Sequence, residues 1–236
     1  INLSLGYSQV FEERYLKIQT YNQYIIGDLV SNTIRVFNSN GSKDEFNFSL
    51  KRNELFIREV DYLEIGVALE DVFNCIPLPV KNKIGLDPVR GGTHRMTSDD
   101  FFKNNTKKFD VVFIDGLHHY EQCHKDCLNS LKALKKNGII LFHDFLPRNS
   151  YEEHVPRKQG TWSGDVWKVA VELMNAKNID FKIANIDRGV GLVRPKENYK
   201  FEKIPELEHM RFKDFYDKYY KSLPIISSEE ALEFLD

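Results

Sequence analysis

Between residues 61 and 194 the sequence alternates short apolar runs with longer amphipathic stretches, and this alternation most constrains the fold. The runs at 61–67, 109–115 and 139–145 have the length and apolar content of buried strands. Amphipathic stretches such as 120–136 separate them. Strands that alternate with helices form a parallel sheet covered on both faces. We therefore expect an α/β fold, a doubly wound, mostly parallel, seven-stranded sheet.

Four more short runs complete the expected sheet, at 83–87, 94–98, 179–186 and 190–194. Only a tight turn separates the last two, so we expect them to pair antiparallel at one edge. A helix should begin at Asp99 with Ser98 as its N-cap.

We expect one domain, 1–236, with its core at about 58–196 and helical additions at both ends. The N-terminal segment 1–57 is expected to be mostly helical around Phe11–Val36. The C-terminal segment 197–236 is expected to return to helix near Glu208–Ser222, where Phe and Tyr recur at helical spacing. That aromatic stripe favours a helix packed on the domain, with a dimer contact or a lid as alternatives. Another helix should start at 227–230.

The charge balance of the chain excludes some partners. It has 33 Lys and Arg against 35 Asp and Glu, a formal net charge of −2, whereas nucleic acids and anionic membranes attract a basic excess. No apolar stretch approaches the roughly 20 residues of a membrane span, and no signal-peptide pattern opens the sequence. We expect a cytoplasmic protein without nucleic-acid or membrane partners; a homo-oligomer is left open. Cys75, Cys123 and Cys127 are interpreted as thiols in a reducing compartment rather than zinc ligands.

Polar residues or glycine stand where the expected strands end, the edge at which open α/β sheets bind ligands. These residues are Glu64, Gly66, Asp87, Ser98, Asp99, Asp115, His143 and Asp144. Asp87 follows Gly66 by 87 − 66 = 21 residues, the spacing at which an acid on the second strand reaches a ribose diol. The single glycine of EIGVALE disfavours a dinucleotide site. It favours a smaller adenosyl ligand without phosphates.

Six segments carry a family resemblance. They are YLEIGV (62–67), IGLDP (84–88), GGTHRMTSDDFF (91–102), FDVVFIDGLHHYEQ (109–122), NGIILFHDFLPR (137–148) and GTWSGDVWK (160–168). Together they resemble the class I S-adenosylmethionine-dependent methyltransferases. The similarity is greatest to the bacterial branch of metal-dependent sugar and macrolide-glycoside O-methyltransferases.

The resemblance implies a cofactor site for S-adenosylmethionine. Glu64 and Gly66 would flank the methionine part, Asp87 would hold the ribose, and Ser98 and Asp99 would lie near the adenine. One departure bears on this site, because Glu70 stands where such enzymes usually have a second loop glycine. It would redirect the loop or weaken cofactor binding.

The resemblance also implies a metal and a base. Asp115 and Asp144 match metal ligands of the relatives, and His118 matches their proposed general base. Asp115 would also border both the cofactor and the reaction centre. His143 replaces an acid, so the set Asp115, His143 and Asp144 would suit manganese or iron at least as well as Mg²⁺. A divalent ion lowers the pKa of a bound hydroxyl, and a histidine can take its proton.

The segment GTWSGDVWK, which holds both tryptophans, follows the last parallel strand. We expect Trp162 to face the substrate, together with Asp165 and His119, and Trp167 to pack in the core. The sequence thus predicts an O-methyltransferase acting on a hydroxyl of a sugar or other glycan precursor. Two alternatives stay open: a catalytically silent binding subunit, and a metal-dependent hydroxylase-like relative.

Overall fold

The computed structural model describes residues 2–8, 13–19, 23–28, 33–47, 60–69 and 71–235. It divides the chain into two units, Ile1–Phe56 and Ile57–Asp236. This division differs from the expected single domain. The expectation for Glu70 lies outside the described residues. No helix in the described ranges is both long and apolar enough to cross a membrane.

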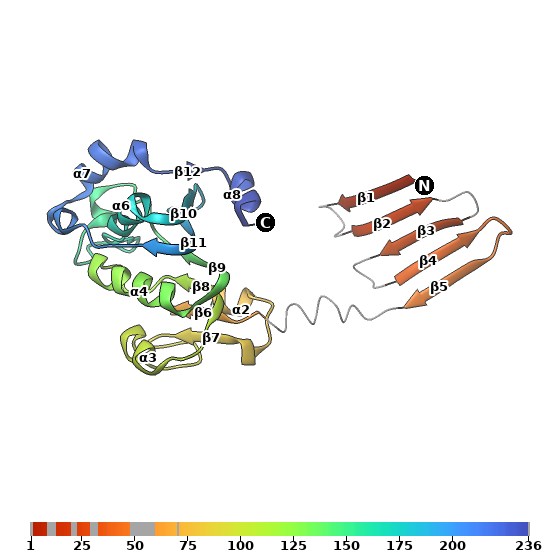
Figure 1. Ribbon diagram of the computed structural model, residues 1–236, viewed down its shortest axis with the longest axis horizontal. Coiled ribbons are helices and arrows are strands. Elements are labelled where there is room, and N and C mark those ends of the chain that lie inside the picture. The colour runs from red at the N-terminus through yellow and green to blue at the C-terminus, as the bar shows by residue number, and fades with distance from the viewer. Residues whose placement is uncertain are drawn as a thin grey trace. The chain divides into compact units, whose positions relative to one another are not determined.

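The first unit is an antiparallel sheet of five strands in the order β1-β2-β3-β4-β5 (Figure 1). The strands are β1 (Asn2–Ser8), β2 (Glu13–Gln19), β3 (Gln23–Asp28), β4 (Thr33–Asn38) and β5 (Lys43–Asn47). The expected helix around Phe11–Val36 is therefore wrong. Short runs such as TIRVFN are rich in β-branched and aromatic residues, which fit a pleated surface, and short apolar runs do not separate helix from strand by periodicity.

The second unit contains a seven-stranded sheet in the order β12-β10-β11-β9-β8-β6-β7 (Figure 1). Its strands are β6 (Tyr62–Ile65), β7 (Lys83–Leu86), β8 (Phe109–Ile114), β9 (Leu134–Phe142), β10 (Lys177–Ala184), β11 (Val190–Lys200) and β12 (Ile225–Ile226). The pairs β7·β6, β6·β8, β8·β9 and β10·β12 are parallel. The expected mostly parallel, doubly wound sheet is confirmed.

Two details of the sheet differ from expectation. Residues 94–98 form no strand; His94 makes only an isolated bridge with Leu86, and the Met96 N–H then turns back to the His94 carbonyl. The seventh strand is β12, from the C-terminal segment. The strands β10 and β11 pair antiparallel as expected, but β12 lies outside β10, so they are not the edge.

Helices cover both faces of this sheet and continue after it. They are α2 (Asp71–Cys75), η1 (Val80–Asn82), α3 (Ser98–Asn104), α4 (Tyr120–Ala133), α5 (Ser150–Glu153), α6 (Trp167–Asn175), η2 (Pro205–His209), α7 (Phe212–Asp214), η3 (Phe215–Tyr219), η4 (Tyr220–Ser222) and α8 (Ser228–Leu235). The N-cap of α3 is Thr97, whose hydroxyl accepts from the Asp100 N–H, and not Ser98. The helix expected near 208–222 is a series of short helical turns. The start of α8 is confirmed, with Ser227 and Glu230 capping each other.

The main core lies between the sheet and the helices α4 and α6. Phe142 on β9 and Trp167 on α6 are both fully buried. Cys123 and Cys127 are free thiols buried on the core side of α4, whereas Cys75 is an exposed free thiol. Phe113 faces the opposite side of the sheet, in a smaller cluster with Tyr62, because successive strand residues point to opposite faces.

The C-terminal aromatic residues pack on this core through Trp167. Its ring centroid lies 5.1 Å from that of Phe215 and 6.0 Å from that of Tyr219. Phe215 is fully buried, whereas Tyr216 is 58% exposed. The stripe therefore has one face in the core and one in solvent. The sequence expectation that Trp167 packs in the core agrees with this arrangement.

Removing the ring of Phe142 should leave a cavity in the centre of the sheet. Phe142→Ala should lower the free energy of unfolding by about 3–5 kcal/mol, measured as a shift of the urea midpoint. Val80→Ala, at a side chain that is 73% exposed, is the control and should change it by less than about 0.5 kcal/mol. Equal effects of the two substitutions would contradict the assignment of the core.

Candidate active site at the carboxyl edge of the sheet

A cavity of about 910 Å³ runs along the carboxyl ends of β7, β6, β8 and β9. Its wall comes from the loops after these strands, the start of α3, one face of α4, the 157–162 segment and Arg188. This volume is near the upper end of the roughly 300–1,000 Å³ of small-molecule sites. The cavity therefore has room for a cofactor and a second ligand.

Gly66 brings the ends of β6 and β8 together. Its φ is +90°, and a Cβ on it would lie 2.1 Å from the backbone oxygen of Asp115. Any side chain would therefore force the two strand ends apart. The Gly66 N–H also donates to the Leu86 carbonyl at 2.8 Å, which ties in the end of β7.

Asp87 is fixed by three backbone donors. Its Oδ1 accepts from the N–H groups of Val89 and Arg90, both at 2.8 Å, and its Oδ2 accepts from Ala68 at 3.1 Å. Burial disfavours the charge, but the three N–H donors outweigh it and hold the pKa of Asp87 below its ordinary value. Asp87 is thus an ionised acceptor on the cavity wall, where a ribose diol can donate to it.

Ser98 and Asp99 belong to a polar cluster centred on Gln122 of α4. The Gln122 amide donates to Ser98 Oγ at 3.2 Å, Asp99 Oδ1 at 3.1 Å and Asp126 Oδ1 at 3.1 Å. All four residues line the cavity. Asp126 is only 1% exposed, and burial raises its pKa to about 6. Gln122 and Asp126 were not predicted as site residues from the sequence, although their spacing of four residues places them on one face of α4.

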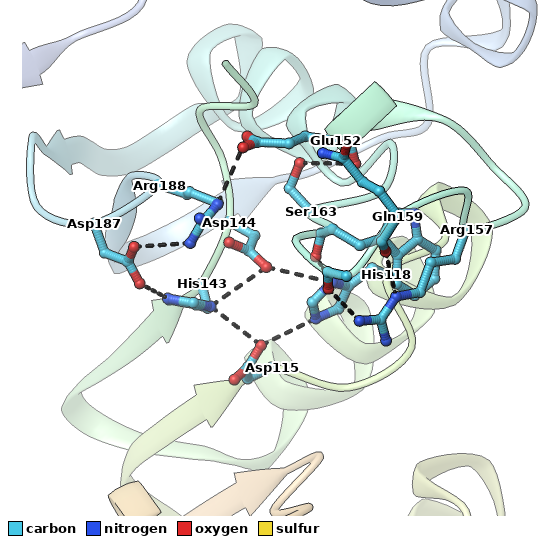
Figure 2. Close-up of polar contacts among 12 residues, drawn as sticks. Asp115, His118, His143, Asp144, Glu152, Arg157, Gln159, Ser163, Asp187 and Arg188 are labelled. Atoms are coloured by element: carbon cyan, nitrogen blue, oxygen red, sulfur yellow. Dashed lines mark hydrogen bonds and ion pairs between the residues drawn. The ribbon is translucent and has the colours of Figure 1, made fainter. Parts of the chain in front are cut away.

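Two acids and two histidines form the centre of the site (Figure 2). His118 Nε2 lies 3.1 Å from Asp115 Oδ1, and His118 Nδ1 lies 2.9 Å from the Trp162 carbonyl oxygen and 3.3 Å from Asp144 Oδ2. His143 Nδ1 lies 3.3 Å from Asp115 Oδ1 and 3.4 Å from Asp144 Oδ2. The structure thus brings together Asp115, His118, His143 and Asp144.

The charges of this group stabilise one another. The flanking carboxylates of Asp115 and Asp144 raise the pKa of His143 far above its ordinary value. Burial opposes the charge on both Asp115 and His118, but their mutual contact outweighs it, lowering the pKa of Asp115 and raising that of His118. His143 is held from its other side by Asp187, whose Oδ2 lies 2.9 Å from Nε2.

The metal set expected from the sequence differs in one residue from the group that the geometry assembles. Ligand atoms of Asp115, His118 and Asp144 all lie within 4.8 Å of one another, whereas His143 contacts the two acids through Nδ1 and Asp187 through Nε2. Asp144 is 3% exposed, and its Oδ1 is buried with no hydrogen-bond partner in the described ranges. Two carboxylates and one imidazole fit a divalent ion. They suit manganese, iron or zinc better than magnesium.

Trp162 covers His118. The two rings stack with centroids 5.1 Å apart and an interplanar angle of 26°, and the indole N–H donates to the His154 carbonyl at 2.8 Å. The chain reaches this position through Gly164, whose φ is +61° and whose Cβ would lie 1.7 Å from the His118 carbonyl oxygen. Trp162 lies on the cavity wall.

Three other expected site residues do not line the cavity. Asp165 accepts from the Tyr120 N–H at 2.7 Å and from Lys168 Nζ at 2.8 Å, so it holds α4 and α6 together. His119 is the N-cap residue of α4, with its ring edge-on to Trp162 at 5.9 Å. Glu64 lies behind the wall, 2% exposed, and accepts from the Tyr62 hydroxyl at 2.5 Å.

Comparisons with known proteins add a family match. Residues 80–145 match a family model described as a methyltransferase domain. This stretch runs from η1 past the end of β9 and contains Asp87, Asp115, His118 and Asp144. None of the curated proteins matches the chain.

Several solved structures are similar to this chain. The SAH-bound methyltransferase PaMTH1 of Podospora anserina is 19% identical, covering 58% of this chain and 72% of that chain with a TM-score of 0.43. The O-methyltransferase from Bacillus cereus in complex with SAH is 11% identical, covering 64% and 83% with a TM-score of 0.43. The MycE methyltransferase of the mycinamycin biosynthetic pathway, in complex with Mg, SAH and mycinamycin VI, is 15% identical, covering 62% and 50% with a TM-score of 0.37.

Glu64 should make stability depend on pH. Burial raises its pKa to about 7, above an unfolded value of about 4.3. Its contribution is therefore complete below about pH 4.3 and is lost as the pH rises toward 7. Glu64→Gln should raise the free energy of unfolding, relative to the parent, more at about pH 8 than at about pH 5. Urea titrations at the two pH values measure this change, and Glu206→Gln on η2 is the exposed control. An equal difference in the free energy of unfolding between Glu64→Gln and the parent at both pH values would contradict the burial argument.

Proposed function

Because residues 80–145 match a methyltransferase domain, we propose that this protein is an S-adenosylmethionine-dependent O-methyltransferase. Its acceptor is a hydroxyl of a sugar or other glycan precursor. The observation that carries the proposal is the placement of His118. It lies on the wall of the cavity that also contains Asp87, between Asp115 and the ring of Trp162.

The cofactor half of the cavity suits an adenosyl ligand without phosphates. Asp87 offers a fixed carboxylate to the ribose hydroxyls, and the cluster around Gln122 offers acceptors for the amino group of adenine. Gly66 lies on the same wall, so its backbone would border the methionine part. Together these groups would hold the methyl group near Asp115, at the junction of β6 and β8.

His118 would take the proton of the acceptor hydroxyl. Both of its ring nitrogens face acceptor atoms, Asp115 Oδ1 and the Trp162 carbonyl oxygen, so the ring holds two protons in this arrangement. For the reaction His118 would first release its Nε2 proton to solvent, and the acceptor hydroxyl would then replace Asp115 at Nε2 of the neutral ring. Trp162 would fix the plane of that ring and stack on a sugar face. Holding the hydroxyl in line with the methyl group supplies much of the remaining rate.

Asp115 and Asp144, with His118, would hold a divalent ion if one binds. Such an ion lowers the pKa of a bound hydroxyl. One imidazole nitrogen cannot both bind an ion and accept a proton, so ligand and base are alternative roles for His118 at that nitrogen.

Cofactor binding tests the first part of the proposal. S-adenosylmethionine should bind in calorimetric titration, and Asp87→Asn should weaken it by about tenfold because the ribose loses a charged acceptor. Asp100→Asn, an exposed acid on α3 that does not line the cavity, is the control. Absence of binding at millimolar cofactor would refute the methyltransferase proposal.

Turnover tests the base. With a panel of sugars and nucleotide sugars, S-adenosylhomocysteine should accumulate only with a true acceptor. His118→Asn should lower kcat by about 10²-fold or more and leave cofactor affinity unchanged. Product analysis separates the alternatives, since a hydroxylase-like enzyme would oxidise the acceptor and a silent subunit would form no product. Undiminished turnover in His118→Asn would remove this residue from the mechanism.

Metal removal tests the ion. The protein treated with EDTA should bind Mn²⁺ in calorimetric titration, and Asp144→Asn should weaken that binding by about 10-fold or more, since it removes one ligand charge. Asp100→Asn again serves as the control. Full turnover after EDTA treatment, together with no Mn²⁺ binding, would exclude an ion from the site.

A further inference from the structure

The cavity wall beyond Asp144 carries only positive formal charge. The wall residues that follow Asp144 in the chain are Arg157, Gly160, Thr161, Trp162 and Arg188. Both charged members of this set are arginines. The opposite end of the cavity carries carboxylates, Asp87 and Asp99 among them, beside Arg90. The two ends of the cavity therefore suit ligands of different charge.

Arg188 is held in place by acids that lie off the cavity wall (Figure 2). Its Nη1 lies 3.0 Å from Asp187 Oδ1, and its Nε lies 3.6 Å from Glu152 Oε2. Its carbonyl accepts from the Leu146 N–H at 2.6 Å, which ties the β10–β11 turn to the chain after β9. Its Nε is buried and has no hydrogen-bond partner among the residues that the structure describes. The guanidinium is thus oriented before any ligand arrives and keeps unused donors.

Arg157 is a cation held by its own loop, and the described part of the chain gives it no acidic partner. Its Nε donates to the Gln159 carbonyl at 2.8 Å, and its Nη2 donates to the Gly160 carbonyl. Its guanidinium carbon lies 5.9 Å from the centroid of a Trp162 ring. Among the described residues no carboxylate lies within ion-pair distance of it. Its charge is therefore uncompensated at the wall.

Both arginines lie next to the reaction centre. Arg157 packs over Trp162, which stacks on His118. Arg188 shares Asp187 with His143. In the sheet order β7-β6-β8-β9-β11-β10, the turn that carries Arg188 is on the far side of β9 from Asp87. The arginines therefore belong to the acceptor side of the cavity and not to the ribose side.

We propose that the methyl acceptor is anionic and that its charged group, a phosphate or a carboxylate, binds Arg157 and Arg188. This inference rests on the proposed function. A guanidinium fork binds either oxyanion through two parallel hydrogen bonds. A neutral acceptor would cover the Arg157 charge without pairing it, which costs free energy, whereas Arg188 already pairs with Asp187 and Glu152 and offers its unused donors. A sugar with a phosphate, a nucleoside diphosphate or a carboxylate has the required charge.

Binding of matched probes tests the proposal without turnover. In the presence of saturating S-adenosylhomocysteine, we would titrate glucose 1-phosphate, glucuronate and methyl glucoside by calorimetry. At least one anionic sugar should bind about tenfold or more tightly than methyl glucoside. Tight binding of glucose 1-phosphate identifies a phosphate site, and tight binding of glucuronate identifies a carboxylate site. No preference for either anionic sugar, including no binding of any probe, overturns the proposal.

Charge-removing variants locate the site. Arg188→Gln and Arg157→Gln should each weaken the binding of the anionic probe by about tenfold and leave the affinity for S-adenosylhomocysteine unchanged. Lys158→Gln, an exposed neighbour of Arg157 that does not line the cavity, should change neither. Arg157→Gln keeps the test valid if Arg188→Gln fails to fold, because the Arg157 side chain is exposed and its hydrogen bonds to described residues stay within its own loop.

Each failure has its own signature. If both variants weaken the binding of S-adenosylhomocysteine and leave the binding of the anionic probe unchanged, the arginines hold the cofactor carboxylate and the inference is wrong. If S-adenosylhomocysteine and S-adenosylmethionine both fail to bind the parent protein, the proposed function itself fails. Anionic preference that survives both substitutions would place the anion elsewhere and contradict the inference.

Discussion

The site depends on the close approach of two strand ends at Gly66. The backbone of Asp115 occupies the space that a Cβ of residue 66 would need, and the Gly66 N–H is bonded to the end of β7. Three strand ends are thereby locked together, so Asp87 and Asp115 lie on one cavity wall. The rigid sheet supplies this precision, since parallel neighbours in register deliver their carboxyl ends to one edge.

Charge then divides the cavity into regions. Asp87 is ionised by its backbone donors at one end, and Asp115 and Asp144 share two imidazoles at the centre. The arginines stand at the other end, oriented by groups behind the wall or within their own loop. A cationic sulfonium cofactor beside the central acids and an anionic acceptor beside the arginines would both be favoured by this order.

Much of the sheet could be predicted because its strands are short, apolar and separated by helical stretches. The segment Phe11–Val36 was misjudged because its runs are too short for periodicity to separate helix from strand. The strand predicted at 94–98 is absent for a different reason. The Gly85 carbonyl accepts from the N–H groups of both Thr93 and His94, so the chain turns there instead of extending. The short strand β12 has too little sequence to be recognised and depends on its pairing with β10.

The sequence by itself determined which residue types stand at the strand ends, since alternating strands and helices direct Gly66, Asp87, Asp115 and Asp144 to one edge. Only the tertiary structure decided how the loop side chains are turned. It placed both His118 and His143 with the two acids, buried Asp126, and directed Asp165 between α4 and α6. Arg188 comes from a turn more than forty residues beyond Asp144, by 188 − 144 = 44. Loop directions follow from packing between distant segments, which no local pattern records.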